Sequence, residues 1–97
     1  MKVFEVGTYE QYEGGFHAFY RTLTESKAHK ILLLAKEHQA RIPKLNLFSS
    51  DEDHQDRFMA CSQIDSDFML ATGLDFKISQ HDKDEYDLVM HGFDLDE

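Results

Sequence analysis

The sequence predicts a small α+β domain in which two or three helices pack on one face of a four-stranded antiparallel sheet made of two hairpins. Three observations predict this fold. The chain has 97 residues, of which 41% are hydrophobic, so it has the size and the apolar content of one domain. Strand-like segments lie near both ends, and the middle repeats apolar residues at helical spacing. The order is therefore ββ-α-α-ββ within a single domain spanning 1–97, with 94–97 expected to fray.

The first hairpin is predicted from residue types. Residues 2–8 and 16–22 are rich in β-branched and aromatic side chains. Between them, Gly14 and Gly15 supply the positive φ angles that a hairpin turn needs. These residues therefore predict two antiparallel strands joined by a short turn.

A helix is predicted next, because apolar residues recur at i, i+3, i+4 and i+7: Ala28, Ile31, Leu32 and Ala35. Three lysines fall off this stripe and are expected to face water: Lys27, Lys30 and Lys36. Thr22 fits a capping box with Glu25, and Thr24 is the alternative cap. Pro43 ends the helix, since proline cannot continue it.

A second helix is predicted to begin after the serines at 49–50, which are followed by three acidic residues where the helix dipole favours negative charge. Apolar residues then keep a helical period: Phe58, Cys61, Ile64, Phe68 and Ala71. Ser66 is placed to cap a separate helix if residues 65–67 break the segment, and Gly73 is placed to end it. The alternative for residues 57–64 is a strand, because short apolar stretches fit both.

The end of the chain predicts a second hairpin. Leu74, Phe76 and Ile78 alternate with polar residues, as in a half-buried strand. Residues 80–85 form a polar turn, and the apolar residues of 86–91 alternate in the same way. The two segments are therefore expected to pair with each other.

Cys61 is the single cysteine, which excludes a disulfide framework and a zinc site with paired cysteines. Its neighbours Phe58, Met59 and Ile64 are apolar, which predicts a buried, inert thiol. The first residues lack the apolar core of a signal peptide, and no apolar run approaches the roughly 20 residues that span a bilayer. We therefore expect a cytoplasmic protein with no membrane partner.

Charge is distributed unevenly. Residues 1–50 carry seven Lys and Arg against five Glu, a net charge of +2, whereas residues 51–97 carry three against fourteen acidic residues, a net charge of −11. The acidic residues of the second half are therefore the candidate binding residues. Those predicted to contact a partner are Asp51, Glu52, Asp53, Asp56, Asp65, Asp67, Asp82, Asp84, Glu85 and Asp87.

Each acidic cluster also has a purely structural explanation. Acidic side chains in the first turn of a helix stabilise it through the helix dipole, which alone accounts for most of the cluster at 51–56. Asp is a common turn residue, which accounts for part of the cluster at 82–87. Yet the four acidic residues between 82 and 87 repel one another, and this costs stability unless a partner or a cation offsets it.

Catalytic and metal motifs are missing from the sequence. A calcium loop counted from Asp82 needs Gly at its sixth position, which Asp87 occupies. The six histidines show no metal-pair spacing, and neither a nucleophile elbow nor a phosphate loop is present. A basic face on the first helix is the one candidate for nucleic acid, and a net charge of −9 opposes it. We therefore predict no catalytic residue, cofactor, metal, small-molecule substrate or direct contact with nucleic acid.

Taken with its size, the hairpin-then-helix opening of residues 2–39 and the Asp-rich second half resemble small acidic phage-encoded anti-CRISPR proteins in overall character. The resemblance implies a domain that occupies the DNA-binding channel of a CRISPR surveillance complex in an infected bacterial host. From the charge itself we expect an inhibitor whose carboxylates compete with nucleic acid for a basic protein. The alternatives are an immunity protein or antitoxin that caps a basic nuclease or toxin, and a generic acidic adaptor.

Overall fold

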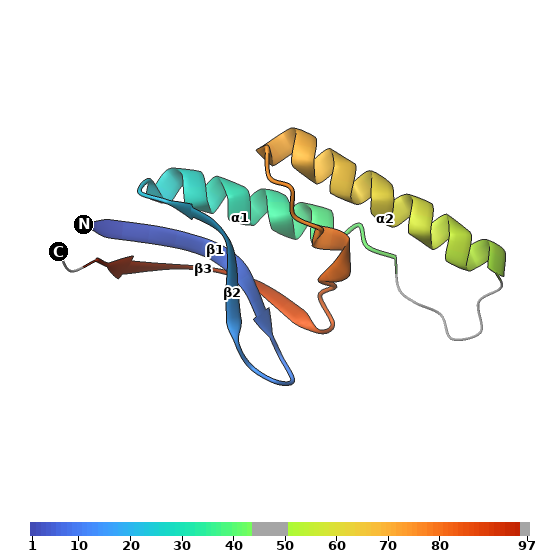
Figure 1. Ribbon diagram of the computed structural model, residues 1–97, viewed down its shortest axis with the longest axis horizontal. Coiled ribbons are helices and arrows are strands. Elements are labelled where there is room, and N and C mark those ends of the chain that lie inside the picture. The colour runs from blue at the N-terminus through green and yellow to red at the C-terminus, as the bar shows by residue number, and fades with distance from the viewer. Residues whose placement is uncertain (44–50, 96–97) are drawn as a thin grey trace.

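The computed structural model describes residues 1–43 and 51–95 of the chain, together with the backbone but not the side chains of residues 51–54. It is an α+β domain whose three strands and two helices follow the order ββααβ (Figure 1). In sequence these elements are β1 (Lys2–Glu10), β2 (Phe16–Thr22), α1 (Glu25–Gln39), α2 (Asp51–Thr72), the short 3-10 helix η1 (Ile78–Gln80) and β3 (Tyr86–Asp94).

The sheet has the strand order β2-β1-β3 and is antiparallel throughout. The first hairpin is confirmed, with Gly14 and Gly15 at positive φ in its turn. β3 pairs with β1 along its whole length, from Lys2 opposite Asp94 to Glu10 opposite Tyr86. The final strand is therefore confirmed, and it runs to Asp94, beyond the predicted limit of residue 91.

The predicted fourth strand is wrong, because residues 74–79 pair with no strand and pass through η1 before the turn into β3. Their alternation is nevertheless real: Ile78 is buried and Leu74 and Phe76 are half-buried, whereas Asp75 and Lys77 are exposed. Both edges of β1 are occupied by β2 and β3. The apolar side chains of 74–78 pack into the core around Phe68 and Ile78 instead.

A β-bulge between Val6 and Gly7 reshapes the first hairpin. Val6 lies opposite Tyr20 and Gly7 opposite Ala18, so Phe19 is the extra residue, and Phe19 and Tyr20 both pack against the core. A Cβ at Gly7 would lie 2.3 Å from the carbonyl oxygen of His17, far inside van der Waals contact. The bulge therefore needs glycine at this position.

Helix α1 covers one face of the sheet (Figure 1). Its buried stripe includes Ala28, Ile31 and Ala35, as the spacing predicts. The predicted exposure of its lysines is confirmed: Lys27, Lys30 and Lys36 face solvent. Thr24 occupies the N-cap position without a side-chain cap hydrogen bond, so the predicted capping box with Thr22 is wrong.

Helix α2 is one continuous helix, so the strand alternative for 57–64 and the predicted break at 65–67 are both wrong. It ends where predicted, at Gly73 with φ +75°. Its predicted apolar stripe is only partly buried. Ile64 and Phe68 lie in the core, whereas Phe58 is 71% exposed.

The molecule is elongated, measuring 55 × 30 × 16 Å along its principal axes. Helix α2 runs beside α1, and its first turns extend beyond the sheet (Figure 1). Side chains on that projecting part have few neighbours, which explains why large apolar residues there remain exposed.

Candidate binding groove

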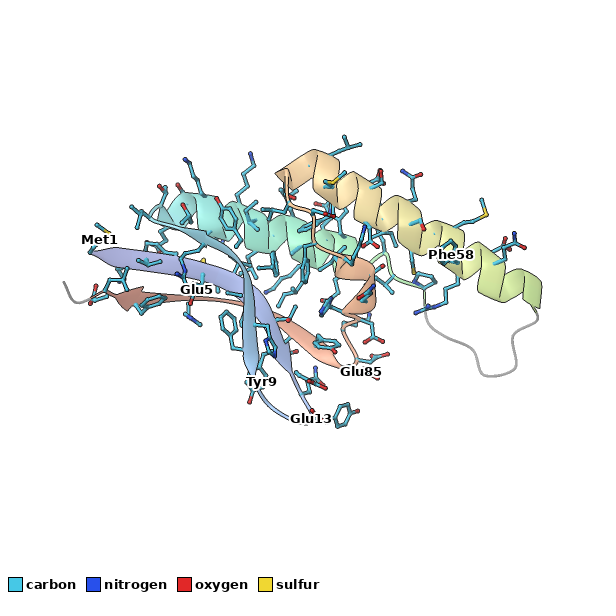
Figure 2. All side chains as sticks on the ribbon, viewed as in Figure 1. Met1, Glu5, Tyr9, Glu13, Phe58 and Glu85 are labelled. Atoms are coloured by element: carbon cyan, nitrogen blue, oxygen red, sulfur yellow. The ribbon has the colours of Figure 1, made fainter. Side chains whose placement is uncertain are left out.

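A groove of about 1100 Å³ separates helix α2 from the segment that leads into β3. Its first wall is formed by one side of α2, and its second by residues 75–85. The lining residues are Arg57, Phe58, Cys61, Ser62, Asp65, Ser66, Met69, Asp75, Lys77, Ser79, Gln80, Asp82, Asp84 and Glu85. Figure 2 labels Phe58 on the helix wall and Glu85 on the wall opposite. We call this feature the α2 groove.

The helix wall carries a large apolar side chain near each end and smaller side chains between them. Phe58 is 71% exposed and Met69 is 45% exposed, so both present apolar surface to the groove. Ser62 and Ser66 lie between them on the same side of the helix. Two large apolar side chains therefore flank a stretch of the helix wall that carries two small serines.

Cys61 also lines the α2 groove, where it is half-buried and unpaired in a disulfide. The prediction of a buried thiol is therefore wrong. Phe58 and Met59, its apolar neighbours in the sequence, both point outward, with exposures of 71% and 62%.

The opposite wall is acidic. Asp82, Asp84 and Glu85 come from the turn before β3, and Asp75 comes from the segment after α2. Among the described residues, Asp82, Asp84 and Glu85 have no side-chain hydrogen bond or ion pair within the domain. Asp75 lies 3.8 Å from the Lys77 ammonium, a separation typical of a weak surface pair.

Asp65 joins the two walls. Its carboxylate accepts a 2.9 Å hydrogen bond from the backbone N–H of Ser79 and a 2.7 Å hydrogen bond from the Ser79 hydroxyl. These contacts fix η1 against α2. Asp65 therefore positions the acidic wall, and its oxygens are already occupied by protein donors.

The pKa of Tyr86 responds to the negative charge at this end of the domain. Burial raises the pKa of Tyr86 above its ordinary value of 10.0, and the negative charges of Glu10, Glu85 and Asp82 raise it further. Two of these carboxylates belong to the groove wall. The negative charge of the acidic wall therefore adds to the effect of burial on the pKa of Tyr86.

The predicted binding residues separate into three groups. Four of them line the α2 groove: Asp65, Asp82, Asp84 and Glu85. Three lie away from it: Asp56 is exposed on α2, Asp67 pairs with Arg41 at 2.8 Å, and Asp87 accepts a 3.0 Å hydrogen bond from Gln11. The side chains of the remaining three, Asp51, Glu52 and Asp53, lie outside the described residues.

A second charged cluster, which the sequence reasoning did not identify, lies on the sheet face opposite α1. Glu5 of β1 is only 8% exposed and accepts hydrogen bonds from Arg21 of β2 at 2.7 and 3.1 Å. His91 of β3 places its Nε2 3.2 Å from Glu5 (labelled in Figure 2). The Arg21 hydrogen bond lowers the pKa of Glu5 below 4.5, with a smaller contribution from His91 and against the opposing effect of burial.

One signal could have identified this cluster: Glu5 is the single charged residue in the otherwise uncharged run 3–8. A buried carboxylate in such a strand requires a cation on a neighbouring strand. The mutual pairing of Glu5, Arg21 and His91 makes the cluster a brace across all three strands.

Within 1–43 and the described part of 51–95, no group of three or more His, Cys, Asp or Glu side chains is arranged to hold a metal ion. No helix in that part of the chain is long and apolar enough to cross a membrane.

Comparison with protein-family models, with curated proteins and with solved structures found no match.

Proposed function

We propose that this domain is a protein-binding inhibitor that occupies the basic nucleic-acid-binding surface of its partner. The proposal is supported above all by one observation. Asp82, Asp84 and Glu85 line the same groove, and within the described part of the domain their carboxylates are not neutralised. Three such carboxylates on one wall favour the binding of Lys and Arg side chains.

A surface that binds nucleic acid presents Lys and Arg to phosphates, and it accepts other anions held at similar spacing. Asp is well suited to such imitation, because its short side chain loses little conformational entropy when it is fixed. The partner class is therefore a basic nucleic-acid-binding protein or complex, and a CRISPR surveillance complex is the member of that class suggested by the sequence resemblance. Association should be fast and sensitive to salt.

A second candidate is an immunity protein or antitoxin that caps a basic nuclease or toxin. Phe58 and Met69 favour this candidate, because nucleic-acid mimicry needs carboxylates and does not require exposed apolar side chains. Both candidates bind a basic protein through the α2 groove. They differ in whether nucleic acid and the domain compete for the same surface.

The test uses immobilised domain to capture proteins from bacterial lysates at low and high salt, followed by mass spectrometry. It compares the native domain with a groove-acid variant, Asp82→Asn/Asp84→Asn/Glu85→Gln. The matched control, Glu25→Gln/Glu37→Gln/Asp94→Asn, removes the same number of charges from exposed positions outside the groove. Captured proteins are then challenged with excess duplex DNA.

We expect the native domain and the control to retain a nucleic-acid-binding protein that is released by high salt and by DNA. We expect the groove-acid variant to lose it. Equal capture by the groove-acid variant and the native domain would contradict the proposal. Retention that resists DNA but requires the groove carboxylates would favour the immunity candidate.

A further inference from the structure

We infer that the α2 groove binds an amphipathic α-helix of the partner, with a large apolar side chain at the centre of its bound face and Lys or Arg on its flanks. This inference rests on the proposed function for the basic character of the partner. It adds the secondary structure of the bound segment and the requirement for an apolar anchor.

The spacing of the helix wall fits this ligand. Phe58 and Met69 are eleven positions apart on α2, which at 1.5 Å per residue separates them by about 16 Å, or three turns of a docked helix. Ser62 and Ser66 line the groove between them. Because these side chains are small, they leave room for a bulky apolar side chain of the partner between two larger neighbours, as knobs fit holes when helices pack.

The negative charge of the wall opposite α2 determines which side chains the flanks of the bound helix must carry. The groove is lined by five acidic residues and by only two basic ones, Arg57 and Lys77. Asp65 is engaged by Ser79 and Asp75 lies near Lys77, which leaves the turn residues to face the ligand. A bound segment that carried only apolar side chains would leave these carboxylates desolvated without partners, which is costly. A segment with Lys or Arg along one flank neutralises them.

The backbone of both walls favours a helix over an extended peptide. A peptide that adds to a sheet needs an exposed strand edge with free N–H and C=O groups. The walls of the groove consist of α2 and of residues 75–85, which form η1 and turns. Their side chains therefore provide the recognition, as in grooves that bind amphipathic helices.

The binding probe is a fluorescein-labelled peptide of about 14 residues, or nearly four helical turns, with Leu at i, i+3, i+4 and i+7 and Lys at most other positions. A control peptide has the same composition in an order that destroys the apolar face. Affinity is measured by fluorescence anisotropy at constant salt. We expect the first peptide to bind the native domain at least about tenfold more tightly than the reordered one, as is typical of an anchored contact.

Two pairs of variants locate the site. Phe58→Ser and Met69→Ser alter groove residues, whereas Met59→Ser and Leu70→Ser alter the next residue on the same helix outside the lining. All four side chains are substantially exposed, so the variants should fold. We expect each groove substitution to weaken peptide binding by about tenfold and each neighbouring substitution to change it less than about twofold.

The outcomes separate the inference from the proposed function. Failure of the ordered peptide to bind, equal binding of the two peptides, or equal effects within each pair of variants would overturn the inference. In each of these cases the proposed function still stands if lysate capture depends on the groove carboxylates. Loss of that dependence, with peptide binding still sensitive to Phe58, would overturn the proposed function and with it the stated partner.

Discussion

The orientation of α2 predicts that truncating two phenylalanines on this helix has very different effects on the stability of the domain. Phe68 is fully buried, with its ring centroid 6.2 Å from that of Phe19 and 5.4 Å from that of His38. Phe58 lies ten residues earlier and is 71% exposed. The change to test is Phe68→Ala, and the matched control is Phe58→Ala.

The expected loss for Phe68→Ala follows from burial. An aromatic side chain buries roughly 150–250 Å², which at about 25 cal/mol/Å² contributes about 4–6 kcal/mol. The alanine retains part of this, so the free energy of unfolding should fall by about 3–5 kcal/mol. That is a large fraction of the total of about 5–15 kcal/mol expected for a domain of this size, and it lowers the melting temperature by roughly 12–40 °C.

Urea denaturation followed by circular dichroism measures both variants. Phe58→Ala should change the free energy of unfolding by less than about 0.5 kcal/mol, as is usual for exposed positions. Similar losses for the two variants would refute the described orientation of α2. A large loss for Phe58→Ala would mean that Phe58 is buried and does not line the groove. Its proposed role in binding would then be withdrawn.

Three further predictions concern the sheet and the acidic wall. Gly7→Ala should destabilise the domain by about 2–3 kcal/mol in urea melts, because its Cβ would collide with the backbone of β2; an unchanged midpoint would contradict the bulge geometry. Glu5→Gln should flatten the decline in stability at low pH. Since the pKa of Glu5 is lowered in the folded domain, the contribution of its carboxylate to stability is complete above about pH 4.5 and is lost as the pH falls through the folded-state pKa. If the variant lost stability at low pH as steeply as the native domain, the prediction would be wrong. Spectrophotometric titration should show a lower pKa for Tyr86 in the groove-acid variant than in the native domain, and an equal value would mean that the wall exerts no field there.

The sequence correctly predicted the elements whose structure depends on residues that are close together along the chain. The glycine turn and the residue types of 2–22 predicted the first hairpin, and the stripe from Ala28 to Ala35 predicted the buried face of α1. The alternation at 74–78 correctly indicated which side chains turn inward. It could not indicate a pairing partner, because alternation reports the two faces of a segment and not the edge beside it.

What the sequence failed to predict about the candidate site has a similar origin. Helical periodicity in α2 identified a stripe from Phe58 to Ala71, but it does not distinguish apolar residues that meet the core from those beyond it. Only the length of α2 relative to the sheet decides this, and length relative to a neighbour is a tertiary property. Asp65 looked like a free surface charge or a helix break, and its actual partner, Ser79, lies across the groove.

The pairing of β1 with β3 joins the two ends of the described chain, and the backbone N–H of Leu95 donates a 2.8 Å hydrogen bond to the carbonyl of Met1. During synthesis, one edge of β1 therefore stays open until β3 has left the ribosome. Closing so long a loop is slow compared with forming a hairpin. A circular permutant that links Leu95 to Met1 and opens the chain between α1 and α2 would make the β1–β3 pair local and would keep the β1–β2 hairpin local. Such a permutant should fold faster than the native chain.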